Sequence, residues 1–138
     1  MDVLKAAQEV LADRGKTYGP PFEGFAMTAR MWSAFFGIPI SAEQVAMAFT
    51  LNKIVRESRA HKDDNLIDIA GYAQVAADII AESYARADFR DHARTRATEK
   101  DLVGAALHGT PFERALADQV LADRAVQRQQ GDAQHDPE

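Results

Sequence analysis

The sequence contains no cysteine, so disulfide bonds and thiolate metal sites are excluded. Any metal ion must be bound through oxygen or imidazole nitrogen. Long apolar runs are also missing, because no window approaches the roughly 18 to 20 apolar residues that a membrane span requires. The opening MDVLKAAQEVLADRG lacks the basic start and the apolar stretch of a signal peptide. We therefore expect a cytoplasmic protein with no membrane partner.

An excess of positive charge is missing as well. The chain holds 16 basic and 21 acidic residues, for a net charge of −5, which argues against non-specific binding to nucleic acid. A small local basic pocket is still compatible with this balance. The four histidines show no spacing typical of a metal site, and we expect them to be surface or loop residues.

Runs of β-branched residues are scarce, whereas alanine is abundant and apolar residues recur at spacings of three and four. This pattern predicts an all-α protein, a compact helical bundle of about five to six helices. At 138 residues and 46% apolar content, the chain is long enough for one core. We expect one domain with a C-terminal helical extension: a helical core over residues 1–92, further helices over 93–130 and a flexible tail over 131–138.

The first half of the chain carries clear start and stop signals. Asp2 can cap a first helix that ends near Gly15, and the loop GKTYGPP should follow, because its glycines and prolines oppose a continuous helix. A second helix should run from about Phe22 to a stop at Gly37. Its side chains available for the core are Phe25, Met31, Trp32 and Phe35.

Later helix starts are marked by capping boxes. Ser41 with Gln44 begins a third helix that runs to about Arg59, and Asp63 or Asp64 can cap a fourth helix. This fourth helix should run from about residue 65 towards residue 88 or beyond. Two shorter helices should follow, one starting at Thr98 and ending near Leu107, and one starting at Thr110 with Pro111 in its first position.

Charged residues gather on either side of the break between the third and fourth helices. Lys53 and Arg56 lie three residues apart, whereas Asp64, Asp68 and Tyr72 follow at spacings of four and share one helix face. Two carboxylates on one face can converge on Mg²⁺, which prefers oxygen ligands, and lysine and arginine can bind phosphate. The alternative is that these charges form solvated helix faces and weak surface ion pairs.

A further oxygen ligand for such a metal could come from Glu57 or Asp63. Nearby, Gly71 lies inside the expected fourth helix. Because glycine costs about 1 kcal/mol in a helix relative to alanine, this position indicates the close approach of another helix or of a ligand.

The segment RGKTYGPPFEGF is a second candidate for phosphate binding. Its glycines free backbone N–H groups, Arg14 and Lys16 are cationic, and Tyr18 could stack on a base or donate a hydrogen bond to phosphate. The segment is not a P-loop, since the pattern G-x-x-x-x-G-K-[ST] is absent. The alternative is an ordered turn with Tyr18 packed on the domain.

Four motifs together resemble an uncharacterised family of small helical proteins common in bacteriophages. They are R-G-K-T-Y-G from Arg14, the helix from Phe22 to Trp32, K-I-V-R from Lys53 and D-N-L-I-D-I-A-G-Y ending at Tyr72. More distantly, the organisation is similar to proteins associated with phage nucleotide modification and to the all-α nucleoside triphosphate pyrophosphohydrolases of the MazG and dimeric dUTPase type. That resemblance implies Mg²⁺, a nucleotide substrate and a homo-oligomer. The chain departs from the pyrophosphohydrolase pattern, because it offers Glu57 where two glutamates are expected and spaces its aspartates by four instead of three.

The leading hypothesis is binding of a nucleotide or another phosphorylated small molecule, extending to Mg²⁺-dependent hydrolysis of a nucleoside triphosphate to monophosphate and pyrophosphate. The alternative is a non-enzymatic phage interaction protein that sequesters a nucleotide signal or inhibits a host factor. A third hypothesis is a purely structural helical oligomer. The expected phosphate and substrate residues are Arg14, Lys16, Tyr18, Lys53, Arg56 and Tyr72, and the expected metal ligands are Glu57, Asp64 and Asp68.

Overall fold

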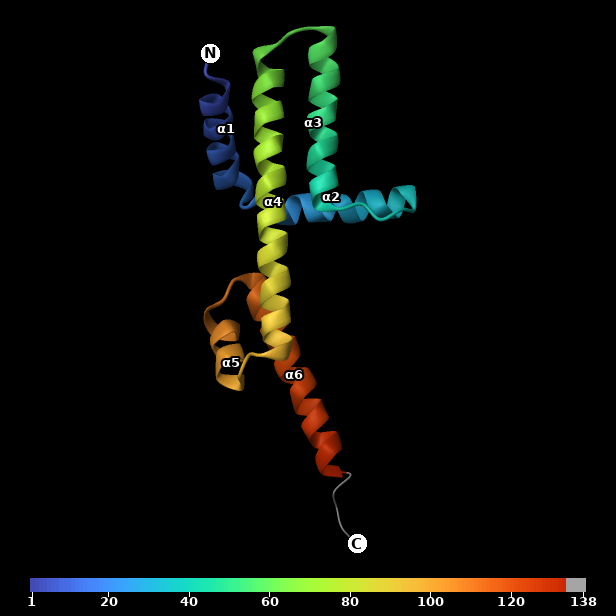
Figure 1. The fold of residues 1–138 in the computed structure, drawn as a ribbon, viewed down its shortest axis with the longest axis vertical. Coiled ribbons are helices and arrows are strands. Elements are labelled where there is room, and N and C mark those ends of the chain that lie inside the picture. The colour runs from blue at the N-terminus through green and yellow to red at the C-terminus, as the bar shows by residue number, and fades with distance from the viewer. Residues whose placement is uncertain (134–138) are drawn as a thin grey trace. The chain divides into compact units, whose positions relative to one another are not determined.

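The computed structural model describes residues 1–133, which form six α-helices and no β-strand (Figure 1). The prediction of an all-α protein is confirmed. The helices are α1 (Val3–Tyr18), α2 (Pro21–Phe36), α3 (Ala42–Arg59), α4 (Asp63–Thr95), α5 (Glu99–His108) and α6 (Pro111–Ala133).

The chain divides into two compact units, Met1–Glu82 and Ser83–Glu138. The division falls inside α4, so this helix contributes residues to both units. The boundary after residue 92 that the sequence suggested stays a prediction.

The two predicted capping boxes, at Ser41 and Thr110, are present, and a third box forms at the predicted helix start Thr98. The Ser41 backbone N–H donates to Gln44 Oε1 over 2.9 Å, and the Thr98 backbone N–H donates to Asp101 Oδ2 over 2.9 Å. The Thr110 backbone N–H donates to the Glu113 carboxylate over 2.7 Å. These short-range bonds satisfy donors that a helix start otherwise leaves unpaired, which explains why sequence located the three starts correctly.

Two helix boundaries differ from the prediction. The first helix continues through Gly15 to Tyr18, and the connection to α2 consists of Gly19 and Pro20 alone. A single helical glycine costs only about 1 kcal/mol, whereas Gly19 adopts a positive φ of 73° that terminates the helix. The fourth helix begins at Asp63, two residues earlier than expected.

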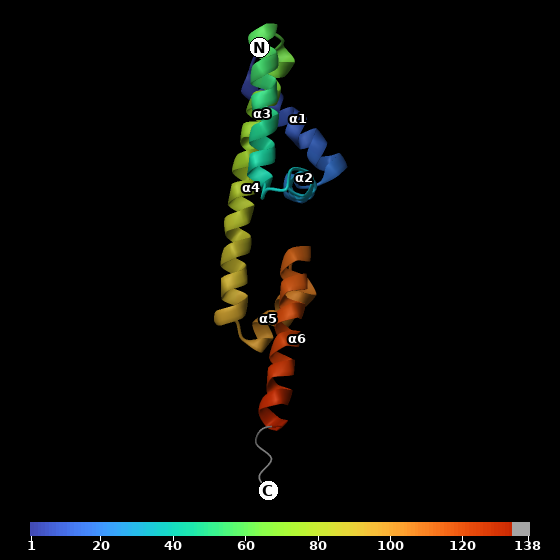
Figure 2. The same cartoon turned by 90° about the vertical axis from the view of Figure 1, so that its right-hand side faces the viewer.

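In the first unit, α3 and the beginning of α4 are antiparallel neighbours, and α2 crosses near the start of α3 (Figures 1 and 2). The buried side chains at the centre come from α3 and α4, and partly buried side chains of α1 and α2 pack against them. The buried set is Ala42, Ala46, Val75, Ala76 and Ile79.

The prediction that Met31 and Phe35 belong to the core is wrong, because their exposed fractions are 66% and 81%. The opposite side of α2 faces the interior: Ala29 is buried, and the Trp32 ring lies 5.9 Å from that of Phe49. Apolar residues surround most of α2, so spacing alone could not indicate which side is buried.

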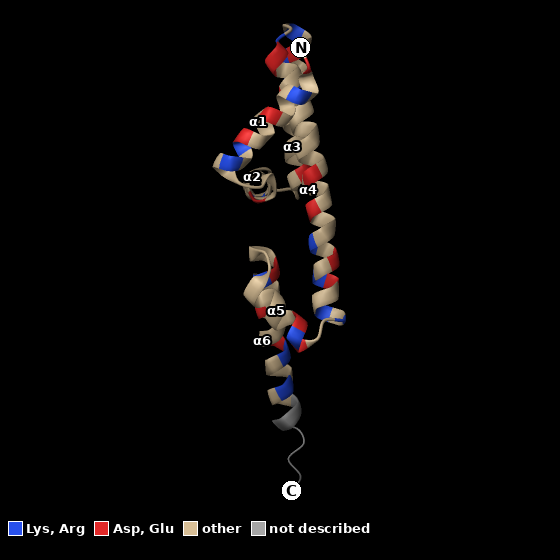
Figure 3. Ribbon diagram, turned by 90° about the vertical axis from the view of Figure 1, so that its left-hand side faces the viewer, with Lys and Arg blue, Asp and Glu red and all other residues tan. Residues whose placement is uncertain are grey.

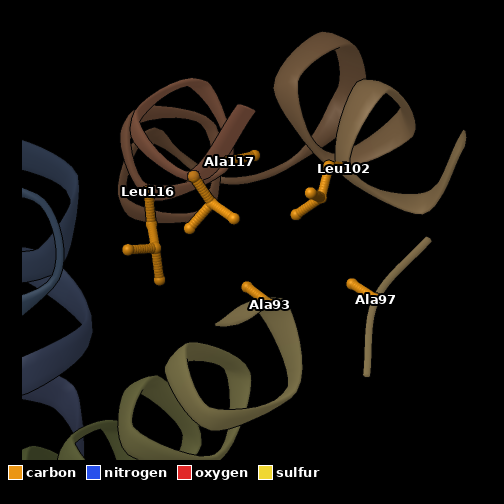
Figure 4. Close-up of a cluster of buried hydrophobic side chains, with 6 residues drawn as sticks. Ala93, Ala97, Leu102, Leu116 and Ala117 are labelled. Atoms are coloured by element: carbon orange, nitrogen blue, oxygen red, sulfur yellow. The ribbon is translucent and has the colours of Figure 1, made fainter. Parts of the chain in front are cut away.

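The second unit has its own apolar cluster, in which side chains of α5 and α6 pack against the end of α4 (Figure 4). Arg124 adds two hydrogen bonds, donating to the carbonyl oxygens of Ala97 over 2.9 Å and of Ala93 over 3.3 Å. The buried set is Ala93, Ala97, Leu102, Leu116, Ala117 and Val120. The helix α6 includes residues 131–133 of the expected tail, whereas residues 134–138, with His135, lie outside the described residues.

Acidic and basic residues are interspersed along the helices (Figure 3). Within residues 1–133, no helix combines the length and the apolar character that crossing a bilayer requires.

Candidate ligand-binding site

A cavity of about 640 Å³ opens in the first unit between α1, α2 and α4, with Phe49 of α3 also in its wall. This volume lies within the range of roughly 300 to 1,000 Å³ that is usual for small-molecule sites. The α4 wall follows helical spacing, which places its residues on one side of that helix. These residues are Ile67, Asp68, Gly71, Tyr72, Val75 and Asp78.

The walls formed by α1 and α2 meet at the short connection through Gly19 and Pro20. Along α1, the lining residues again recur at spacings of three and four, which gives that helix one apolar side ending in Arg14 and Tyr18. Because the connection contains only two residues, the end of α1 and the start of α2 are held close together. The lining residues of α1 are Ala7, Val10, Leu11, Arg14, Gly15 and Tyr18, and those of α2 are Pro21, Gly24, Phe25 and Thr28.

Aromatic rings form a connected group at the cavity. Phe49 stacks on Tyr72, with ring centroids 5.4 Å apart and an interplanar angle of 27°, and contacts Phe25 edge to face at 6.0 Å. Tyr18 also lines the cavity, and its exposed fraction is 83%, so the alternative that Tyr18 packs on the domain is wrong. The group offers aromatic surface against which a planar ligand can stack.

Glycines from three helices contribute to the wall. A Cβ atom added at Gly15, Gly24 or Gly71 would have no atom within 4 Å apart from its chain neighbours and the backbone of its own helix. The interpretation of Gly71 as a point of close approach between helices is therefore wrong. All three positions line the cavity, so an added methyl group there would lie in free space beside it.

The structure brings Lys53, Asp64 and Asp68 together. The Lys53 ammonium contacts Asp68 Oδ2 and lies 3.7 Å from Asp64 Oδ2. The Lys53 and Asp68 side chains are only 15% and 12% exposed, whereas Asp64 is 73% exposed. The Lys53 ammonium group is thus already paired with both carboxylates that the sequence analysis assigned to a metal ion.

Glu57, the third expected metal ligand, belongs to a hydrogen-bonded turn between α3 and α4. Its carboxylate lies 2.5 Å from His61 Nδ1 and accepts hydrogen bonds from the Lys62 backbone N–H over 3.1 Å and from Asn65 Nδ2 over 3.0 Å. The donors favour the charged carboxylate and lower the pKa of Glu57 to about 2, with His61 the largest cause. The Glu57 carboxylate in turn raises the pKa of His61, which also lies 3.3 Å from Asp63.

The expected magnesium ligands do not fit a metal site in this arrangement. Glu57 is bound by the donors of its own turn, and Asp68 is paired with Lys53. Within residues 1–133, no group of three or more His, Asp or Glu side chains could hold a metal ion.

The remaining expected residues divide between the cavity and the surface. Arg14, Tyr18 and Tyr72 line the cavity, whereas Lys16 and Arg56 are exposed and do not line it. Sequence reasoning missed the contributions of Phe49 and Asp78, and it missed the contact between Glu57 and His61. The contact between Glu57 and His61 could have been predicted, because the two residues are four positions apart at a helix end.

The fold and the cavity together define a class: an all-α domain that encloses an aromatic-lined space of small-molecule size. The chain belongs to the family described as Domain of unknown function (DUF6378), whose family model matches residues 2–80. This range contains every residue that lines the cavity. No curated protein and no solved structure matches the chain.

Proposed function

We propose that the first unit binds a nucleotide or another phosphorylated small molecule in the cavity between α1, α2 and α4. The observation that carries the proposal is the lining itself, which joins Arg14, Tyr18 and Tyr72 around a space of about 640 Å³. A guanidinium group can donate two parallel hydrogen bonds to a phosphate, and tyrosine rings can stack on a base. The distant similarity of the organisation to proteins associated with phage nucleotide modification supports a nucleotide as the ligand.

The proposal concerns binding, because the residues expected to hold Mg²⁺ are engaged in other contacts. A protein that binds a nucleotide without converting it would match the alternative from the sequence, a non-enzymatic protein that sequesters a nucleotide signal. Release of pyrophosphate from a nucleoside triphosphate is the measurement that separates these possibilities. Turnover that exceeds that of an Asp68→Asn variant would favour hydrolysis over retention.

Calorimetric titration with nucleosides and nucleotides tests the binding proposal directly. We expect heat from at least one of them, and we expect Arg14→Gln and Tyr18→Ala to weaken that binding by about tenfold each, since a charge-assisted hydrogen bond and a stacked ring contribute on the order of 1.4 kcal/mol or more. Both side chains are exposed, so their loss should leave the fold intact.

Two matched controls separate the site from general surface effects. Lys16→Gln removes a positive charge two residues from Arg14 on the same helix, but Lys16 does not line the cavity. Tyr84→Ala removes a tyrosine that is 74% exposed outside the cavity. Binding should be unchanged in both. The absence of heat with every nucleoside and nucleotide, or equal losses in the controls, would contradict the proposal.

We also propose that a second copy of the chain covers the exposed apolar side chains of α2 and α3. Seven of them have exposed fractions between 46% and 81% and recur at helical spacing. Exposed apolar side chains in this number on two contacting helices are typical of a surface that another protein chain covers. The seven are Met27, Met31, Phe35, Met47, Leu51, Ile54 and Val55.

Light scattering coupled to size-exclusion chromatography tests this self-association. The wild-type chain should elute as an oligomer, and the double variant Phe35→Ser with Leu51→Ser should elute as a folded monomer. Leu107→Ser is the matched control, since Leu107 is 66% exposed on α5 in the second unit. A monomeric wild-type chain would contradict the proposal.

A further inference from the structure

Few charges line the cavity, and Arg14 is the one cation among its lining residues. Among the lining residues, Arg14 carries a positive charge, whereas Asp68 and Asp78 carry negative charges. No other lining residue is charged. A ligand in this cavity therefore meets one guanidinium group and two carboxylates.

The other cations expected to bind phosphate are not available to a ligand in the cavity. Lys53 is held by Asp68 and Asp64. Lys16 and Arg56 do not line the cavity. Phosphate groups beyond the first would add negative charge without a further cation in the wall to compensate it.

The carboxylates are suited to a different part of a ligand. Asp78 accepts a hydrogen bond from Gln74 Nε2 over 2.8 Å, and Asp68 is fixed by Lys53, so both are oriented by neighbours while still lining the cavity. An ionised carboxylate only accepts hydrogen bonds. It favours the hydroxyl groups of a sugar and the amino or N–H groups of a base, and it disfavours phosphate oxygens.

The aromatic and glycine surfaces fit a planar ring. Tyr72 is stacked on Phe49, which holds its ring in place, and its neighbour Gly71 leaves the adjacent space open. Nucleobases stack readily on such surfaces, because every base has a π face. The lining as a whole therefore matches a base, a sugar and one phosphate group.

We propose that the ligand is a nucleoside or a nucleoside monophosphate, and that a lining with one available cation and the Asp78 carboxylate discriminates against diphosphates and triphosphates. This inference rests on the proposed function of nucleotide binding. Arg14 binds the single phosphate, and the two carboxylates bind sugar or base donors.

Calorimetric titration with adenosine, AMP, ADP and ATP in the presence of EDTA tests the inference, with the guanosine and cytidine series run in parallel. In the series that binds, the monophosphate should bind at least as tightly as the nucleoside, and affinity should fall by about tenfold or more from monophosphate to triphosphate. Affinity that rises with each phosphate would overturn the inference and leave the proposed function standing. Absence of binding in all three series would contradict both the inference and the proposal that this cavity binds nucleotides.

Asp78→Asn tests the electrostatic cause. This substitution removes one negative charge from the lining, so the ratio of monophosphate to triphosphate affinity should fall by about threefold or more. Asp13→Asn, at an exposed position of α1 that does not line the cavity, changes the net charge equally and should leave the ratio unchanged. Equal ratios in the wild type and in Asp78→Asn would show that the acidic lining does not determine the preference.

Discussion

The two units of the chain use apolar side chains differently. In the first unit, aromatic rings and helical glycines border an open cavity, and the apolar side chains buried at the centre are those of alanine, valine and isoleucine. In the second unit, Leu102 and Leu116 are at most 7% exposed and fill the space between three helices. The difference indicates that stability and an open site place opposite demands on a small helical unit, since each unfilled position forgoes burial that would stabilise the fold.

The largest effect should come from opening the filled core of the second unit. Leu102→Ala removes a side chain that is 1% exposed and leaves a void, which should lower the free energy of unfolding by about 2 to 5 kcal/mol. Denaturant unfolding measures this loss. Ligand binding by this variant should be unchanged at a temperature where it stays folded. A loss of binding there would show that the core of the second unit also affects the ligand site.

A smaller loss is expected from the pair between Lys53 and Asp68. Asp68→Asn leaves the mostly buried ammonium with only Asp64 at 3.7 Å, and should lower the free energy of unfolding by about 1 to 3 kcal/mol. Asp64→Asn removes a carboxylate that is 73% exposed and should cost less than about 0.5 kcal/mol. Equal losses in urea unfolding would show that burial does not distinguish the two contacts.

Filling the cavity wall should separate stability from binding. Gly71→Ala should raise the free energy of unfolding by about 0.5 to 1 kcal/mol, because alanine is the better helix former and its methyl group meets no atom within 4 Å. The same methyl group should weaken the proposed nucleotide binding by about threefold or more, since it would occupy space beside the ligand.

Gly104→Ala is the matched control. Gly104 lies inside α5, also has open space around an added Cβ, and does not line the cavity. This variant should gain the same stability while binding remains at the wild-type value. If Gly71→Ala binds the ligand as tightly as Gly104→Ala does, the glycine at position 71 has no part in ligand recognition.

The smallest effect is expected at the turn between α3 and α4. Because Glu57 raises the pKa of His61 above 6.5, the stabilisation from this contact is complete below pH 6.5 and declines as the pH rises through the folded-state pKa. The contribution of Glu57 has the opposite sign: it is present above pH 4.5 and is lost as the pH falls towards about 2. Unfolding measured between about pH 5.5 and about pH 8 should therefore isolate His61.

His61→Gln should flatten the decline in stability over that range. His108→Gln, on the exposed end of α5, should retain the wild-type slope. Identical slopes for the wild type and both variants would exclude a contribution from the Glu57 and His61 contact.

Sequence predicted the features that depend on neighbours a few residues apart. The capping boxes at Ser41 and Thr110, the helix start at Thr98 and the stop at Gly37 are local in this sense. Sequence also placed Asp64 and Asp68 on one helix face, and the antiparallel arrangement of α3 and α4 brings both against Lys53.

The cavity could not be derived in the same way, because its lining comes from four helices whose packing is a tertiary property. The spacing that marked Gly71 as unusual could not distinguish a neighbouring helix from free space. Spacing likewise could not orient α2, whose exposed Met31 and Phe35 are as apolar as its inward-facing Phe25 and Trp32. Burial is decided by the partners of a helix as well as by its own pattern.

Because Gly15, Gly24 and Gly71 line the cavity, the residues at these positions should indicate whether other members of the DUF6378 family have kept the ligand site. A lineage that evolves only towards heat resistance could replace these glycines one by one, and each replacement would reduce the space for a ligand. A member that carries alanine or larger residues at all three positions should have abandoned the site while keeping the helices. A member that keeps the glycines while its surface diverges should have kept the ligand.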